Sequence, residues 1–452
     1  MERPRVLIVG GGFAGVECAR GLERGLPARE AEITLVTPHN YSLYLPLLPQ
    51  VAAGVLTPQS IAPSLRRMLH RTRIVPGGVV GIDTADKVCL VRLIDNEVVS
   101  IRYDRLVLTP GSVTRTFDIP GLTEHARGMK TLAEAAYVRD HVISQLDIAA
   151  ACSNEEERAA RLQFVVVGGG YAGTETVAYL QRLTGAAARR YPRLDPSLIK
   201  WHLIDIAPKL MPELGDRLGA KAMELLKKRG TEISLGVSVS EVTEDTVRFT
   251  DGRLLPCRTL IWTAGVTASP LIGTLGAETV RGRLAVSPDL TVPGFPEVLA
   301  CGDAAAVPDL SKEDGDAICA PTAQHAQRQG KQAARNVIAA LRGQQLTPYE
   351  HKDLGLVVDL GGIDAVSKPL GYELAGLPAQ AVARSYHLMA LHTGVARFRT
   401  VANWLINATA GDDFVRTGFL SRQPATLRDF ERTDVYLSPE DVRKQMAEGK
   451  AG

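Results

Sequence analysis

The sequence predicts an α/β fold with two domains of the same type, followed by a C-terminal amphipathic helical segment. The main observation is a repeat: an apolar strand, a glycine-rich turn and a helical pattern follow one another at residues 5–19, and the same order starts again at residue 164. The chain has 452 residues, too many for one domain of the usual size of roughly 100–200 residues. A strand, a glycine turn and a helix open a Rossmann-like domain, so we expect two such domains.

Composition excludes several classes of protein. Hydrophobic residues make up 45% of the chain and charged residues 23%, which allows large buried cores and excludes a disordered chain. The net charge of +2 gives no reason to expect nucleic acid as a partner. Because the chain has neither a signal-peptide layout nor a run of 18 apolar residues, we expect it neither to be secreted nor to span a membrane.

The cysteines and histidines show no metal-site pattern. The six cysteines are widely spaced, and the closest two, Cys301 and Cys319, are 18 positions apart. No C-x-x-C pair occurs, so we expect neither a disulfide framework nor a zinc module. The nine histidines do not cluster at ligand spacing. We therefore expect no metal and a reducing cytoplasm as the compartment.

The first glycine turn follows the apolar strand Arg5–Val9. In the G-x-G-x-x-G pattern, Gly10 permits the tight turn, Gly12 lets the backbone approach a pyrophosphate, and Gly15 lets the helix pack closely on the strand. The helix N-terminus offers N–H groups to the anion. The candidate dinucleotide contacts in this turn are Gly10, Gly12, Phe13, Ala14 and Gly15.

The second glycine turn repeats the first 158 residues later, after the strand Phe164–Val167. A single glycine turn is weak evidence, whereas two turns that both lie between a strand and a helix predict two dinucleotide sites. The candidate contacts in the second turn are Gly168, Gly170 and Gly173.

The strand after each turn is expected to end in an acid that binds a ribose hydroxyl. The second copy ends in Asp205, and this acid favours NADH because the extra phosphate of NADPH would meet a negative charge. The first copy ends in Thr37, whose hydroxyl makes a weaker contact. The second turn is therefore the expected NADH site.

Turns later in the chain indicate which glycine turn binds FAD and which binds NADH. A buried strand ends in a turn at residues 106–112, and the pattern returns at residues 259–265. A third strand ends in Gly302 and Asp303, which resembles the second flavin fingerprint of two-dinucleotide-binding flavoproteins. We therefore expect an FAD domain at residues 1–120 and 280–345, with the NADH domain at 160–270 inserted between its two parts. The further FAD candidates are Thr109, Gly111, Gly302, Asp303 and Ala323, and the further NADH candidates are Glu175, Asp205, Ala264 and Gly265.

More specific motifs lie outside the glycine turns, at Asn40–Tyr41, Pro46–Gly54, Tyr191–Pro196, Leu260–Val266 and Ala320–Gly330. With them, the chain resembles the type II NADH dehydrogenases, single-subunit flavoproteins that pass electrons from NADH to quinone. The resemblance extends to about Asp412 and implies a glutathione-reductase-like architecture with FAD and NADH as cofactors. Thr37, in place of the usual acid, and the stretch 42–45 depart from the family pattern and leave the fine positioning of FAD open.

The resemblance also implies roles for two side chains. Gln324 would line the quinone pocket at the start of a helix beside the flavin ring, where an amide can hold a quinone carbonyl without acting as a base. A glutamine-rich solvent face explains Gln327 and Gln329 equally well. Glu175 matches a family position near the nicotinamide and the flavin, where a carboxylate could deliver a proton. Its alternative role is to complement the helix dipole in the first turn, as Glu17 would in the first copy.

The C-terminal segment, residues 346–452, is expected to contain strands and helices that contact a membrane or a second copy. No acidic residue occurs between Glu373 and Asp412. An apolar stripe, with Trp404 at its edge, consists of Leu388, Leu391, Val395, Phe398, Ala402 and Leu405. A basic amphipathic helix of this kind is typical of an anionic membrane surface, although packing on the protein's own body or a homodimer seam would use the same stripe. A charged tail with Arg416, Arg422, Arg428, Asp429, Glu431 and Arg432 is expected to form a solvated helix or cap.

Together these observations predict a non-proton-pumping NADH:quinone oxidoreductase of the respiratory chain, peripheral on the cytoplasmic face of the cell membrane. Four alternatives are considered. A dithiol reductase lacks its cysteine pair here. A sulfide:quinone oxidoreductase would need distant cysteines such as Cys152 and Cys319 to converge. Another soluble NAD(P)H:acceptor flavin reductase, or a binding flavoprotein without turnover, would be reduced by NADH but not reoxidised by quinone.

Overall fold

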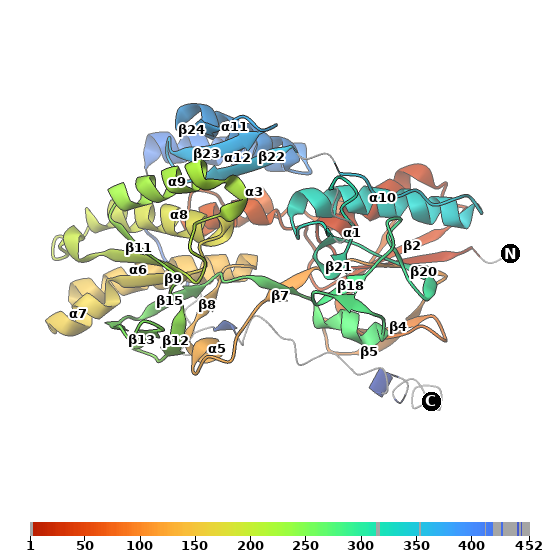
Figure 1. Cartoon of the computed structure of the whole chain (residues 1–452), viewed down its shortest axis with the longest axis horizontal. Coiled ribbons are helices and arrows are strands. Elements are labelled where there is room, and N and C mark those ends of the chain that lie inside the picture. Colours follow the sequence, from red (N-terminus) through yellow and green to blue (C-terminus); the bar gives the residue numbers. More distant parts are fainter. Residues whose placement is uncertain are drawn as a thin grey trace.

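The structure is a computed structural model, and it describes residues 3–312, 317–351, 354–411, 413–418, 426–427, 441–442 and 444. Figure 1 shows two α/β halves side by side, with a third, smaller part lying along the top of the molecule. The predicted α/β class is observed in both halves, since each is built on a sheet whose central strands are parallel.

The first sheet has eight strands in the order β19-β20-β6-β1-β2-β3-β4-β5. Its central strands are parallel and almost fully buried, as expected for a sheet covered by helices on both faces. Its strands are β1 (Arg5–Val9), β2 (Glu32–Thr37), β3 (Arg73–Asp83), β4 (Val88–Leu93), β5 (Val98–Arg102), β6 (Arg105–Leu108), β19 (Thr291–Val292) and β20 (Phe295–Ala300).

Two long helices from opposite ends of this domain pack together. Helix α1 (Phe13–Gly25) follows the first glycine turn. Helix α10 (Ala323–Leu341) follows in the chain only after the second α/β half, which is inserted between them. A side chain at Gly330 would collide with the backbone of Ala14, so the two helices approach at backbone distance. This contact joins the two chain segments 1–120 and 280–345.

The second sheet has five strands in the order β11-β10-β9-β15-β8. Its edge strand β8 and the long helix α6 come before residue 160, so this half begins earlier than the expected range 160–270. Its strands are β8 (Arg127–Gly128), β9 (Gln163–Val167), β10 (Lys200–Asp205), β11 (Thr231–Leu235) and β15 (Thr259–Trp262), and its helices are α5 (Leu122–His125), α6 (Leu132–Ala151), α7 (Glu155–Arg161), α8 (Tyr171–Ala188) and α9 (Asp216–Lys228).

Small antiparallel elements complete both halves. The paired strands β7 and β16 cross between the halves in Figure 1. The remaining short strands are β7 (Ser112–Thr114), β12 (Val239–Val242), β13 (Thr246–Phe249), β14 (Leu254–Pro256), β16 (Val266–Ala268), β17 (Thr279–Val280), β18 (Arg283–Ala285) and β21 (Ala305–Ala306), and the short helices near the first sheet are α2 (Leu48–Ala52), α3 (Pro58–Ile61) and α4 (Leu65–Met68).

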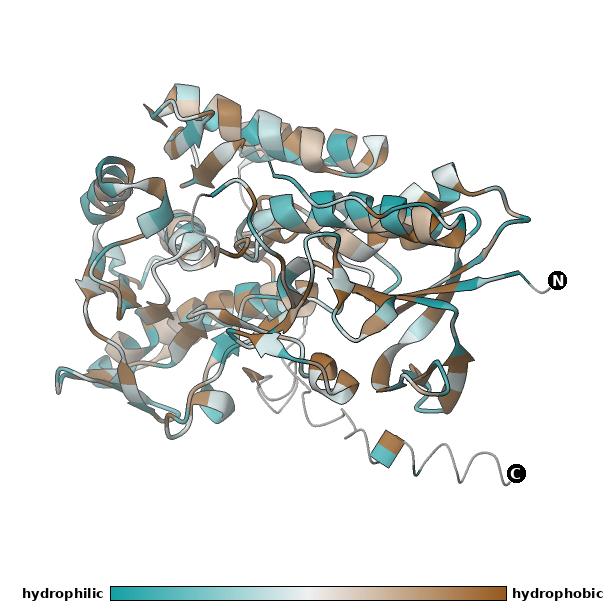
Figure 2. Ribbon diagram, turned by 45° about the vertical axis from the view of Figure 1, so that its right-hand side comes forward, coloured by the Kyte–Doolittle hydropathy of each residue, from teal (hydrophilic) through white to brown (hydrophobic). Residues whose placement is uncertain are grey.

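The third part consists of the antiparallel strands β22 (Gly355–Asp359), β23 (Ala365–Pro369) and β24 (Leu374–Ala375) and the helices α11 (Leu377–Ala390) and α12 (Gly394–Ala410). It lies along the same side of the molecule as α8, α9 and α10 (Figure 1). In Figure 2 the helices along the top edge carry brown, hydrophobic residues among teal ones, whereas the strands of the large sheets are largely brown.

The prediction that the apolar stripe lies on one helix is wrong, because the chain forms two helices here, α11 and α12, separated by a break at residues 391–393. Thr393 caps the N-terminus of α12 by accepting a hydrogen bond from the backbone N–H of Ala396. Leu391, part of the predicted stripe, is only 1% exposed. The predicted stripe is therefore divided between a buried break and an exposed face of α12.

Beyond α12, the described part of the tail follows the opposite side of the molecule. Thr417 donates to the Asp140 carboxylate on α6 through its backbone N–H and its hydroxyl. Leu427 and Val442 are buried against the second and the first half, respectively. Arg422, Arg428, Asp429, Glu431 and Arg432, on which the predicted tail helix rests, lie outside the described residues. Within the described ranges, no helix is both long enough and apolar enough to cross a membrane.

Candidate functional site

The first glycine turn has the geometry that its sequence predicts. Gly10 has a positive φ of 103°, a conformation that favours glycine. A side chain at Gly15 would collide with the carbonyl oxygen of Gly10. The hydroxyl of Thr109, at the end of β6, donates to the carbonyl oxygen of Val9 at 2.7 Å and closes the turn from the neighbouring strand.

The second turn repeats this geometry residue by residue. Gly168 has a φ of 115°, and a side chain at Gly173 would collide with the carbonyl oxygen of Gly168. The Thr263 hydroxyl donates to the Val167 carbonyl oxygen at 2.7 Å, as Thr109 does in the first copy. Ala264 and Gly265 follow directly, and Gly265 has a φ of 95°.

Both turns leave room for a ligand where a pyrophosphate is expected. Gly12 and Gly170 are the N-caps of α1 and α8, and no side chain caps either helix. A Cβ added at Gly12 or Gly170 would meet no atom within 4 Å. Uncapped backbone N–H groups beside open space fit the phosphates of a dinucleotide.

Asp303 lies at the edge of the first turn's site, in the one-turn helix η5 (Gly302–Ala304). Its carboxylate accepts a 2.6 Å hydrogen bond from the Ser112 hydroxyl, which in turn accepts from the Lys130 ammonium at 2.7 Å. Gly302, after β20, adopts a φ of 76°, and Gly111, after the neighbouring strand β6, adopts 73°. The predicted FAD residues therefore gather at the carboxyl ends of β1, β6 and β20.

The residues that end the second strand of each copy occupy equivalent places. Asp205 accepts hydrogen bonds from the backbone N–H of Gly169 and, at 2.6 Å, from that of Ala207. Thr37 lies beside Gly11 in the same way and is 3% exposed. Asp205 thus stands at the glycine turn where a ribose acid is expected, and Thr37 fills the corresponding place with an uncharged side chain.

Glu17 and Glu175 occupy equivalent positions on the two turn helices, but their surroundings differ in charge. Each is the fifth residue of its helix, so the expected first-turn interaction with the helix dipole is wrong for both. Burial would raise the pKa of Glu17, but His392, Lys331 and Arg20 lower it below its ordinary value. Among the described residues, no basic side chain lowers the pKa of Glu175: burial, together with the Asp359 carboxylate, raises it well above the ordinary value, against one backbone hydrogen bond.

Asp359 is the centre of a buried polar cluster that the sequence analysis did not identify. Its backbone N–H donates to the Glu175 carboxyl at 2.9 Å. Its own carboxylate accepts from the amides of Gln50 at 3.3 Å and Gln380 at 3.0 Å, and from the backbone N–H of Gly361 at 2.8 Å. The one available signal was an acid at the end of the apolar run 355–358.

Gln324 contacts the other end of the same strand. Its amide nitrogen donates to the Gly355 carbonyl oxygen at 3.0 Å, whereas its amide oxygen is buried without a partner among the described residues. Ala323 begins α10 directly after the cap Thr322. Strand β22 therefore contacts Gln324 of the first half at Gly355 and Glu175 of the second half at Asp359.

Comparisons with known proteins agree with this architecture. Residues 4–330 match the family of pyridine nucleotide-disulphide oxidoreductases. The type II NADH:quinone oxidoreductase Ndh of Mycobacterium tuberculosis is 32% identical over 422 residues, which cover 90% of this chain and 88% of that protein. The chain belongs to the type II NADH:quinone oxidoreductase family. The predicted family, fold class and enzyme class, a flavoprotein oxidoreductase with FAD and NADH as cofactors, are thereby confirmed.

Solved structures place this family member among its structural neighbours. NDH2 from Plasmodium falciparum in complex with NADH superposes with a TM-score of 0.84 and 18% identity, over 92% of this chain and 100% of that one. The sulfide:quinone oxidoreductase of Aquifex aeolicus has a TM-score of 0.66 and 16% identity, over 91% and 96% of the two chains. Both likenesses concern the fold alone.

The cysteines of this oxidoreductase give little support to sulfide chemistry. Cys152, at the end of α6, donates to the Asn154 carbonyl oxygen at 3.3 Å. Cys319 is buried near α10, and burial raises the pKa of its thiol to about 11, so it is a poor nucleophile at neutral pH. All six cysteines are free thiols, and no hydrogen bond or disulfide among the described residues joins Cys152 to Cys319.

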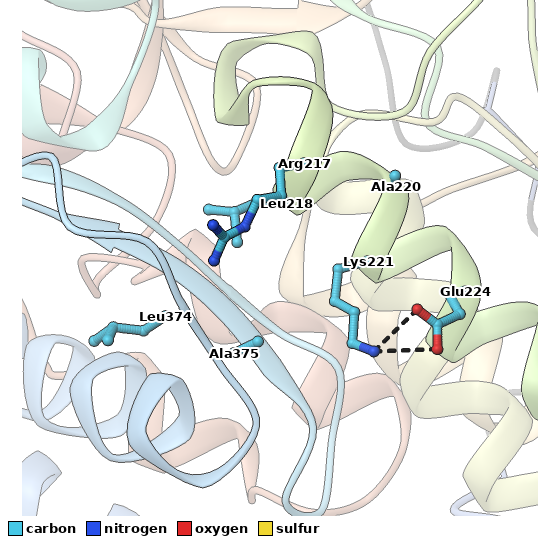
Figure 3. Close-up of a pocket in the computed structure, with 7 residues that line it drawn as sticks. All are labelled: Arg217, Leu218, Ala220, Lys221, Glu224, Leu374 and Ala375. Atoms are coloured by element: carbon cyan, nitrogen blue, oxygen red, sulfur yellow. Dashed lines mark hydrogen bonds and ion pairs between the residues drawn. The ribbon is translucent and has the colours of Figure 1, made fainter.

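A surface groove of about 420 Å³ lies apart from the glycine turns, between α9 and β24. Figure 3 shows Arg217 and Lys221 on α9 facing Leu374 and Ala375, with Lys221 paired to Glu224 at 2.9 Å. Its cations are already engaged, because Arg217 also pairs with Glu373 at 3.1 Å. We assign no ligand to this groove.

Proposed function

We propose that this protein is a peripheral, non-proton-pumping NADH:quinone oxidoreductase that reduces a membrane quinone from the cytoplasmic face of the cell membrane. The observation that carries the proposal is strand β22, which holds Gln324 at one end and Glu175 at the other. Gly355 and Asp359 are four residues apart, which corresponds to about 13 Å of extended strand. A quinone ring bound at Gln324 and the proton donor Glu175 can therefore both lie along this one strand.

The two nucleotides are assigned to the two turns. The first turn, with Thr109, Gly111 and Asp303, would hold FAD, and the second, with Asp205, would bind the ribose of NADH. Bound FAD supplies the two-electron chemistry that links NADH oxidation to quinone reduction. The protein contributes the N–H groups of α1 and α8 as anion sites and the Asp205 carboxylate as an acceptor for a ribose hydroxyl.

Gln324 and Glu175 are the residues proposed to act on the quinone. The amide of Gln324 can hold a quinone oxygen, and its buried, unpartnered oxygen can accept from the hydroxyl of the quinol product. Reduction of a quinone takes up two protons, and oxidation of NADH provides only one together with its electrons. The buried Glu175, with its raised pKa, is suited to supply the other proton.

The exposed face of α12 is proposed to contact the membrane. Phe398, Leu405 and Ile406 are 75%, 64% and 58% exposed. The opposite face packs on the protein, where Asn403 donates to the Ser60 hydroxyl at 3.0 Å. An apolar face on an acid-free helix that carries the exposed Arg399 is suited to an anionic lipid surface, and a homodimer seam is the alternative occupant.

Anaerobic stopped-flow measurement on the purified holoprotein tests the reaction. Mixing with NADH should bleach the flavin band, and a second mix with a short-chain quinone should restore it within the same time range. Bleaching without return would show that the acceptor is another molecule. Bleaching by sulfide, lost when Cys152 and Cys319 are both replaced by alanine, would favour the sulfide alternative.

Vesicle co-sedimentation tests the membrane face. Phe398→Asp should lower binding to vesicles with anionic lipid at least tenfold, because a charge on the apolar face loses buried area and adds repulsion. Ile94→Asp, on the exposed β4–β5 hairpin, is the matched control and should bind like the wild type. If instead sedimentation velocity shows that Phe398→Asp dissociates a dimer and leaves vesicle binding intact, the face is a dimer seam.

A further inference from the structure

We propose that Asp359 is a positioning residue: its backbone N–H fixes the Glu175 carboxyl, and its side-chain charge favours the protonated form of that carboxyl until the quinone is reduced. The proposal rests on the proposed role of Glu175 as the proton donor. Asp359 is 2% exposed and ends β22, the strand that also contacts Gln324. Its position is therefore tied to both proposed quinone residues.

The backbone of Asp359 fixes the orientation of the carboxyl. The 2.9 Å hydrogen bond from its N–H engages one oxygen of Glu175. The neighbouring strand β23 holds β22 in register, with Asp359 opposite Ala365. Because this donor belongs to a paired strand, the Glu175 side chain has a rigid partner, and its second oxygen is left to carry the proton.

The side chain of Asp359 accepts hydrogen bonds from neutral donors. Gln50, Gln380 and the backbone N–H of Gly361 donate to it, and the Tyr179 hydroxyl also interacts with it. No ion pair within the described part of the chain places a cation on Asp359, and its like charge acts on Glu175.

The titratable groups around Glu175 and its direct neighbours come from four elements. Tyr179 lies on helix α8 with Glu175, Asp359 lies on β22, and Tyr44 lies before α2. Arg384, Tyr386 and His387 lie on α11 and act on Tyr179 or Tyr44. Burial raises the pKa of Tyr44 and of Tyr179 well above the ordinary value, so both phenols are neutral. Burial lowers the pKa of His387 to about 4, so its imidazole is neutral as well.

Arg384 is the remaining cation, and it lies over the Trp404 ring at 5.1 Å. Its charge acts on Tyr179. Among the described residues, the like charge that acts on Glu175 is that of Asp359. A like charge disfavours ionisation, so the Asp359 carboxylate raises the pKa of Glu175, whereas the backbone N–H of the same residue lowers it. A substitution of the side chain alone separates the two effects, because it leaves the backbone hydrogen bond in place.

Replacing Asp359 by asparagine removes the like charge, so the pKa of Glu175 should fall and its proton should be lost at a lower pH. We expect the midpoint to fall by about one pH unit, a shift of the size that a neighbouring charge produces. The rate of quinone reduction should then decline at correspondingly lower pH.

Infrared spectroscopy of the holoprotein reads this proton without relying on turnover. The C=O stretch of a protonated carboxyl is titrated from about pH 5 to about pH 10. This range covers the pKa shifts of several units that buried carboxyls can show. The band that Glu175→Gln removes is assigned to Glu175. In Asp359→Asn its midpoint should fall, and in Asp359→Glu, which restores the charge, it should return towards the wild-type value.

Asp364→Asn is the matched control. Asp364 lies on the same hairpin and pairs with Arg229, away from Glu175. It should leave the midpoint unchanged. An unchanged midpoint in Asp359→Asn would overturn the proposal. Should that variant not fold, Asp359→Ser also removes the like charge, keeps a hydroxyl that can accept from the Gln380 amide, and should lower the midpoint as well; no shift there would overturn the proposal.

The role of Glu175 as the proton donor is tested separately from the role of Asp359. If Glu175→Gln is reoxidised by quinone at the wild-type rate, Glu175 is not the proton donor, whatever the infrared midpoint does. If that variant is slow and Asp359→Asn shows no shift, the role of Glu175 stands and that of Asp359 fails.

Discussion

At the scale of single residues, the two turn helices show how environment sets the chemistry of one side-chain type. Glu17 is paired with Arg20 at 3.1 Å and with His392 at 3.3 Å, and is held as an anion. Glu175 has the same position on its helix and faces another carboxylate instead. Identical residues at equivalent positions thus serve structure in one copy and are available for proton transfer in the other.

Asp205 should set the choice of nicotinamide cofactor. Asp205→Ala is expected to weaken the binding of NADH. It should also narrow the preference for NADH over NADPH by about tenfold or more, because the 2′-phosphate of NADPH no longer meets a like charge. Steady-state kcat/KM for both cofactors measures the change. Thr37→Ala, at the equivalent place of the first copy, is the matched control, and an unchanged ratio in Asp205→Ala would refute the assignment.

Gln324 should act on the second half-reaction only. Gln324→Ala is expected to slow reoxidation by quinone about tenfold while leaving flavin reduction by NADH nearly normal, since its amide contacts β22 and not the second turn. Double-mixing stopped flow separates the two steps. Gln327→Ala, one turn further along α10, should behave like the wild type; equal loss of both steps in Gln324→Ala would disprove the role.

At the scale of elements, the strand–turn–helix unit separates residues needed for folding from residues needed for binding. Gly173 packs against the carbonyl of Gly168, whereas Gly170 borders open space. Both belong to the same fingerprint in the sequence. Only the packing around each position reveals which of them the fold itself requires.

This difference predicts opposite behaviour for two variants of the same turn. Gly170→Val should raise the Kd for NADH at least tenfold with little change in Tm, because the added side chain occupies the place expected for the pyrophosphate. Gly173→Ala should lower Tm by several degrees, as its methyl group collides with backbone. Calorimetry and NADH titration of both variants provide the check, and a Gly170→Val protein with unchanged NADH affinity would argue against a site there.

The helices of the third part show how a break determines which residues remain exposed. Leu391 turns inwards at the break, and Trp404 donates to the Gln50 amide oxygen at 2.8 Å. Phe398 and Leu405 are left on the outer face. A continuous helix would have placed all of these residues on one stripe, so the break divides anchoring residues from surface residues.

At the scale of the whole molecule, the chain joins its two halves on opposite sides. Strand β22 contacts α10 and α8 on one side. On the other side, the tail is held at Asp140 of α6 and, further along, at Val442, which packs with Val80, Val88 and Leu90 of the first half. A Cβ at Gly81 would collide with the Val442 side chain, so this contact is close.

The tail contact should contribute to stability. Val442→Asp places a charge in an apolar cluster where Val442 is fully buried and should lower the free energy of unfolding by about 2–4 kcal/mol. Val415→Asp is the matched control on the same tail, because Val415 is 63% exposed. Denaturant unfolding gives both values; equal stability of the two variants would show that the Val442 contact contributes nothing.

The sequence by itself determined the family, the α/β class and the two glycine turns, because these depend on short-range patterns. A strand, a turn and a helix N-terminus lie within about fifteen residues, and glycines are required there by backbone geometry. The strand ends at Thr37, Asp205 and Asp303 could be placed for the same reason.

Tertiary structure alone decided which residues surround Glu175 and where the C-terminal stripe breaks. Asp359 is 184 positions from Glu175, and Trp404 is 354 positions from Gln50. Neither pair leaves a local pattern, because a hydrogen bond between buried side chains depends on how distant elements pack. The charge around Glu175 is likewise a property of four elements together, and so it is read only from the folded chain.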